Sequence, residues 1–72
     1  MMEEFKNRLL DKYDQIISEL EKIDSENRAI LTNATANKTM PETELAKVMA
    51  FARENHRRLQ FAKAERELIE KY

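Results

Sequence analysis

Apolar residues recur every three or four positions through the first half of the chain. They are Met2, Phe5, Leu9, Tyr13, Ile16, Leu20, Ile23, Ile30 and Ala34. This spacing places side chains on one face of an α-helix, and the alternation that marks a strand is absent. From Tyr13 onward the row is a heptad, in which Asn27 fills the one polar place. Leu10, Ile17 and Leu31 lie beside this row and widen it. We predict a helix over about residues 2–33.

The segment Asp24-Ser25-Glu26-Asn27 is the weakest part of this helix, because only Glu26 is a strong helix former. Asp24 could cap a new helix there and divide the segment in two. We favour one continuous helix, since the apolar rhythm has the same phase on both sides.

A connection is expected at about residues 34–39, where Thr and Asn residues gather. Asn33 or Asn37 can take the left-handed conformation that ends a helix, because the chain contains no Gly. Thr39 and Glu42 have the spacing of a capping box, with Pro41 in the first turn. We predict that a second helix begins at about residue 40.

The second helix is expected to continue to about residue 71, because no helix-breaking residue interrupts it. Its inward row comprises Leu45, Val48, Ala52, Asn55, Leu59, Ala62, Arg66 and Ile69. Met49 and His56 flank this row on one side, and Phe51, Leu68 and Tyr72 flank it on the other, with Phe61 farther round. These flanking side chains are more than one neighbouring helix can cover.

Two helices with a short connection predict an all-α fold, a single antiparallel helical hairpin over residues 1–72. A two-helix unit this small gains little from one core. Both apolar stripes are wider than a two-helix contact requires, so we expect pairing into a homodimeric four-helix bundle. The orientation of the two hairpins stays open at this stage, as does replacement of the second copy by a different protein.

Composition narrows the class of protein. The 72 residues include no Gly, no Cys and a single His, which excludes glycine-rich phosphate loops, disulfides and thiolate metal sites. The net charge is −1, with −3 in residues 1–36 (five basic, eight acidic) and +2 in residues 37–72 (eight basic, six acidic). No apolar run is long enough to span a membrane or to form the core of a signal peptide, so we expect a cytoplasmic protein.

The sequence offers little for catalysis. His56 is the one side chain that titrates near neutral pH, and its sequence neighbours Glu54 and Arg57 do not share its face. A Glu-x-x-His metal motif would need Glu at position 53, where Arg53 stands. The carboxylates are expected to lie on solvated faces, where four of them form i,i+4 pairs: Asp24–Arg28, Glu54–Arg58, Lys63–Glu67 and Arg66–Glu70. We expect no catalytic residue, metal or cofactor, and a non-enzymatic protein.

The candidate binding residues lie on the second helix. Arg53 and Arg57 repeat on one outward line, and Phe61, Leu68 and Tyr72 form an apolar group. We expect these five to bind a partner protein and the chain to act as a small regulator, inhibitor or chaperone-like adaptor. The apolar group is alternatively part of the dimer core.

The alternative function is binding of nucleic acid. Arg53, Arg57, Arg58 and Lys63 would contact phosphates, twice over in a dimer. The isoelectric point of about 5.8 disfavours this function, because dedicated duplex binders are usually strongly basic.

Two asparagines stand at inward positions of the predicted helices, Asn27 and Asn55. Either a partly solvated contact tolerates them, or a buried Asn selects register and oligomeric state. The residues expected to determine dimerisation or register are Asn27, Asn55, Ile17, Leu31 and Leu59.

Overall fold

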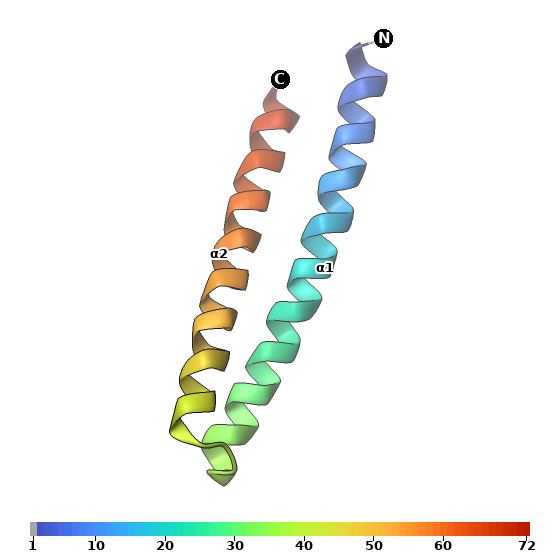
Figure 1. The fold of residues 1–72 in the computed structure, drawn as a ribbon. Helices are drawn as coiled ribbons and strands as arrows, with labels where there is room; N and C mark the ends of the chain where they lie inside the picture. Colours follow the sequence, from blue (N-terminus) through green and yellow to red (C-terminus); the bar gives the residue numbers. More distant parts are fainter. Residues whose placement is uncertain (1) are drawn as a thin grey trace.

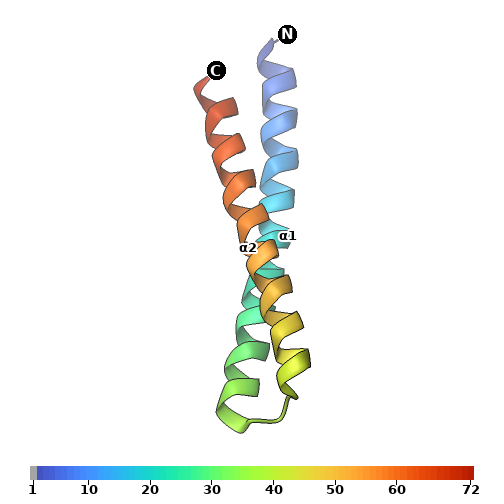
Figure 2. The same ribbon diagram turned by 60° about the vertical axis from the view of Figure 1, so that its left-hand side comes forward.

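The computed structural model describes residues 2–72, which form two antiparallel helices, α1 (Met2–Asn37) and α2 (Glu42–Lys71). The helices run side by side from a tight turn to an open end that carries both termini (Figures 1 and 2). The molecule is a rod of 55 × 14 × 13 Å. The predicted all-α helical hairpin is therefore confirmed. Within residues 2–72, neither helix is long and apolar enough to span a membrane.

Helix α1 is continuous through Asp24–Asn27, as we favoured from the sequence. The Asp24 carboxylate lies 3.2 Å from the Arg28 guanidinium one turn later, and Asn27 is buried against α2. Packing and an i,i+4 ion pair thus keep weak helix formers in the helix, so Asp24 does not cap a new one.

The end of α1 lies one turn beyond the predicted boundary, at Asn37. The Asn37 amide donates a hydrogen bond of 2.6 Å to the Asn33 side-chain oxygen, so these side chains bond to each other along the helix. Lys38, with φ 51°, takes the left-handed conformation that we expected at Asn33 or Asn37. That expectation was wrong because both asparagines are still helical.

Helix α2 begins two residues later than predicted, and the expected capping box does not form. Pro41 is the N-cap, and no side chain donates or accepts a capping hydrogen bond there. The Pro41 carbonyl instead accepts from the Leu45 N–H at 2.9 Å. Glu42 and Glu44 in the first turn complement the helix dipole.

The face that α1 turns toward α2 is shifted from the predicted one, although Asn27 and Ala34 of the predicted row are buried as expected. Ile17 and Leu31 are half-buried between the helices, whereas Ile16 and Ile30 are 45% and 47% exposed. The rows through Ile16 and Ile17 lie side by side on α1. One neighbouring helix covers too small a part of the circumference of α1 to bury both rows. Asp14 and Glu21 form ion pairs with α2, and Asp24 contacts His56, all on the Ile17 side of α1. These contacts can form only with that side inward and the Ile16 row outward.

Candidate functional site

One long side of the hairpin is lined by ion pairs between the helices; we call it the polar face. Arg66 of α2 bonds to Asp14, and Lys63 lies 3.7 Å from Glu21. The hydrogen bond from Arg66 to Asp14 raises the pKa of the Arg66 guanidinium. These contacts join the helices along the polar face and leave few apolar side chains there.

The opposite long side carries an apolar row from each helix; we call it the apolar face. Its α1 row keeps a seven-residue spacing: Met2, Leu9, Ile16, Ile23 and Ile30. This row lies about 80° from the contact line with α2, as estimated from helix geometry. On α2, Phe51 lies at the same angle from the contact line, and Tyr72, the C-cap of α2, follows it at a multiple of seven residues. In an antiparallel helix pair, residues at equal angles from the contact line lie on the same side, so both rows belong to one face.

Aromatic and aliphatic side chains extend the apolar face beyond these two rows. Phe5 borders it on α1, and Phe61 and Leu68 border it on α2. Phe51 and Phe61 are 60% and 65% exposed. The group predicted from the sequence, Phe61, Leu68 and Tyr72, thus joins a larger surface that α1 completes, which the α2 sequence alone did not indicate.

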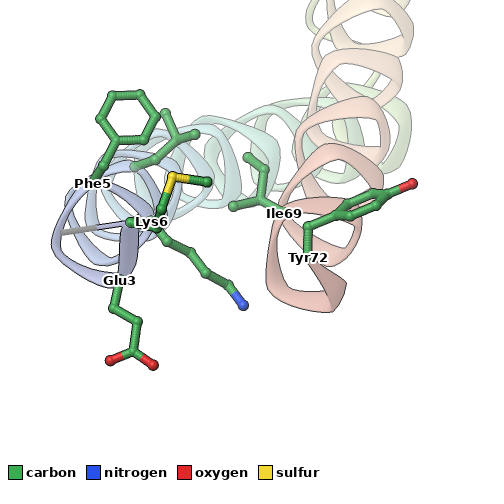
Figure 3. A pocket seen from close by; sticks show the side chains of 7 residues that line it. Glu3, Phe5, Lys6, Ile69 and Tyr72 are labelled. Carbon is green, nitrogen blue, oxygen red and sulfur yellow. The ribbon is translucent and has the colours of Figure 1, made fainter.

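A cleft of about 340 Å³ opens at the free end of the hairpin, where the apolar face ends. Its apolar walls come from Met2, Phe5 and Leu9 of α1 and from Ile69 and Tyr72 of the C-terminal end. Figure 3 shows Phe5 and Glu3 on opposite sides of α1, with Ile69 and Tyr72 across from them. The Lys6 ammonium donates to the Glu70 carbonyl at 2.8 Å and bridges the two helices here.

A smaller, polar pocket of about 270 Å³ lies on the polar face, around His56. The His56 Nδ1 is 3.4 Å from an Asp24 oxygen, a contact that we missed because α1 supplies the carboxylate. Ser25 also lines this pocket, but no hydrogen bond joins it to His56 within the part of the chain described. Over residues 2–72, no three His, Cys, Asp or Glu side chains converge on a metal position.

The basic residues singled out from the sequence do not gather into one patch. Arg57 and Arg58 both pair with Glu54, at 3.2 and 3.6 Å. Lys63 pairs with Glu21 of α1, so the expected pairing with Glu67 was wrong, because the carboxylate across the helix contact lies within reach.

The other three expected pairs, Asp24–Arg28, Glu54–Arg58 and Arg66–Glu70, are formed. Arg53 lies exposed on the outer surface of α2.

Both inward asparagines are buried, at 6% exposure for Asn27 and 7% for Asn55. The Asn55 amide donates to the Leu20 carbonyl at 3.2 Å and so links the helices. The Asn27 Nδ2 is buried without a hydrogen-bond partner in the described residues. Leu59 is buried, and Ile17 and Leu31 are half-buried, so these three pack within the hairpin.

The hairpin has a thin interior. Its buried apolar residues are Ala34, Leu59 and Ala62, and no large side chain of residues 2–72 is fully buried. The accessible surface is 6161 Å², against roughly 4,700 Å² for a compact monomer of 8.6 kDa. About 1,500 Å² of surface is therefore in excess of what such a mass usually exposes.

Comparison with known proteins adds no relative to these observations. No protein-family model matches the chain, and no curated protein or solved structure is significantly similar to it.

Proposed function

We propose that this chain is a non-enzymatic protein–protein interaction module, which self-associates into a homodimeric four-helix bundle. In this proposal it acts in the cytoplasm as a small regulator, inhibitor or adaptor of a partner protein. The observation that carries it is the apolar face, an unpaired surface along the length of a hairpin with almost no core of its own.

The mechanism is helix-on-helix packing. A second amphipathic hairpin laid on the apolar face removes the exposed side chains of both molecules from water. Phe61, Leu68 and Tyr72 act as anchors because they offer large apolar areas at low entropic cost. Arg53 and Arg57, on the outer surface of α2, steer the encounter with a partner protein.

Self-association is tested by sedimentation equilibrium at micromolar concentration. We expect a mass about twice 8.6 kDa for the wild-type chain. Ile16→Glu places a carboxylate in the apolar face and should give the monomer mass. Gln15→Glu, an exposed neighbour off that face, is the matched control and should remain dimeric. A monomeric, cooperatively melting wild-type protein would contradict the proposal.

Partner binding is tested by photo-cross-linking in the native host. A photoreactive residue at Arg53, exposed on the outer surface of α2, should give an adduct heavier than the homodimer, and one at Gln15 should not. If Arg53 yields no such adduct, the chain is a self-associating protein without a regulated partner.

Binding of nucleic acid is the alternative function. Arg53, Arg57, Arg58 and Lys63 would supply the phosphate contacts, and three of these cations already pair with Glu54 or Glu21. Affinity for a mixed-sequence DNA duplex that falls steeply between 50 and 200 mM salt would favour this alternative.

A further inference from the structure

The two rows of the apolar face differ in chemistry. The α1 row is aliphatic from Met2 to Ile30. The α2 row, at the same seven-residue spacing, runs Phe51, Arg58, Glu65, Tyr72 and thus carries two opposite charges between two aromatic rings. A molecule that covers the apolar face must satisfy an aliphatic row and a charged row at once.

We propose that the occupant is a second copy of this chain in one orientation. It lies antiparallel on the apolar face, with α1 on α1 and α2 on α2 of the second copy. The two-fold axis then passes beside Phe61. This inference rests on the self-association proposed above and determines the pairing that the sequence left open.

Charge complementarity selects this orientation. Arg58 and Glu65 lie three and four residues from Phe61, on either side of it. A two-fold axis at Phe61 therefore brings each Arg58 opposite Glu65 of the second copy. In the parallel arrangement, with both turns at one end, α2 would lie on α1 of the second copy, with Arg58 facing Ile23 and Glu65 facing Ile16. Burying charges against an aliphatic row that offers them no opposite charge is costly, so that arrangement is disfavoured.

The aliphatic row agrees with the same axis. Its four residues from Leu9 to Ile30 are centred between Ile16 and Ile23. With the axis there, Ile16 faces Ile23 of the second copy, and Leu9 faces Ile30 of the second copy. Leu9 lines the cleft at the open end, and Ile30 is 47% exposed near the turn. The cleft of each copy thus receives an apolar side chain from the turn end of the other.

The apolar face is large enough to form the interface of a stable dimer. From Met2 to Ile30 the face is about 42 Å long at 1.5 Å per residue, and two helices give a width of about 20 Å. Roughly 800 Å² per copy would be buried, which is the usual size for specific association. The excess surface of the isolated hairpin, about 1,500 Å², is large enough to supply this area.

Charge reversal tests the orientation. Arg58→Glu places a carboxylate opposite Glu65 of the second copy at both symmetric contacts. We expect dimerisation measured by sedimentation to be about 30-fold weaker. Arg28→Glu is the matched control: Arg28 also pairs with a carboxylate four residues earlier, Asp24, but it lines the pocket on the polar face, so this variant should dimerise as the wild type does. Circular dichroism at 222 nm verifies that both variants stay helical.

Restoring the opposite charges should restore the dimer. The double variant Arg58→Glu/Glu65→Arg should dimerise like the wild type. An equimolar mixture of the two single variants, Arg58→Glu and Glu65→Arg, should form mainly heterodimers, because only the mixed pair has opposite charges at both contacts.

A cysteine at the axis gives a second readout, since the chain contains no Cys. Phe61→Cys should form a disulfide-linked dimer on oxidation, because the two Cα atoms would lie within about 7 Å. Gln60→Cys, which lines the pocket on the polar face, should not.

These experiments distinguish failure of the proposed orientation from failure of self-association. A dimer in which Arg58→Glu has no more effect than Arg28→Glu, and Phe61→Cys does not cross-link, overturns the orientation alone. A monomeric wild-type chain overturns the proposed function as well.

Discussion

Replacing Asn27 by Leu should stabilise the protein, and Asn55→Leu should do so much less. Both side chains are buried at equivalent inward positions, but the Asn55 amide donates to the Leu20 carbonyl while the Asn27 Nδ2 has no partner in the described residues. An unpaired buried amide costs about 1–3 kcal/mol. Leu removes that cost at position 27 and adds apolar burial.

We therefore expect Asn27→Leu to raise the free energy of unfolding by about 2 kcal/mol. At position 55 the same apolar gain is offset by loss of a hydrogen bond of about 1 kcal/mol, so the net change should be about 1 kcal/mol or less. Each kcal/mol corresponds to roughly 4–8 °C in Tm for a domain of this size.

The assay is thermal unfolding followed by circular dichroism at one fixed protomer concentration, because association makes Tm depend on concentration. Sedimentation of the same samples shows whether the oligomeric state changes. Unfolding of Asn27→Leu at or below the temperature of Asn55→Leu would refute the reasoning. A changed oligomer in either variant would assign that asparagine a role in selecting register.

Three further predictions concern the turn, an ion-pair network and a phenol. Lys38→Gly should raise Tm by a few degrees, because Gly takes the positive φ of 51° without the cost of about 1 kcal/mol that a Cβ imposes, whereas Lys38→Val should lower it. Arg66→Ala should lower the free energy of unfolding in urea titration, since Arg66 bonds to both Asp14 and Glu70, and high salt should shrink the difference. Burial and a hydrogen bond to a carboxylate raise the pKa of Tyr13 above its usual 10. The stability that Tyr13 contributes is therefore complete below pH 10 and is lost as the pH rises through the pKa of the folded protein. Tyr13→Phe should remove this loss from the curve of unfolding free energy against pH.

Periodicity alone predicted most of the fold. The three-four rhythm predicted two helices, and the Thr- and Asn-rich segment before Pro41 predicted the turn between them. Their boundaries were less accurate because side chains at the turn had alternative partners. Asn33 and Asn37 bond to each other, and this leaves the left-handed position to Lys38.

Contacts between the helices could not be predicted from spacing within one helix. The carboxylate beside His56 and the partner of Lys63 both come from α1, more than thirty residues away in sequence. Residues this far apart meet only once the register of the two helices is established, which depends on packing along the whole rod.

The sequence by itself determined that α1 carries two adjacent apolar rows, one through Ile16 and one through Ile17. Which row faces α2 was decided only in the tertiary structure. Neighbouring residues are separated by about 100° around a helix, and a single neighbour covers little more than that arc. With the Ile17 side inward, Asn27 and Ala34 are buried and Asp14 and Glu21 reach their partners on α2, so Ile16 is left on the apolar face.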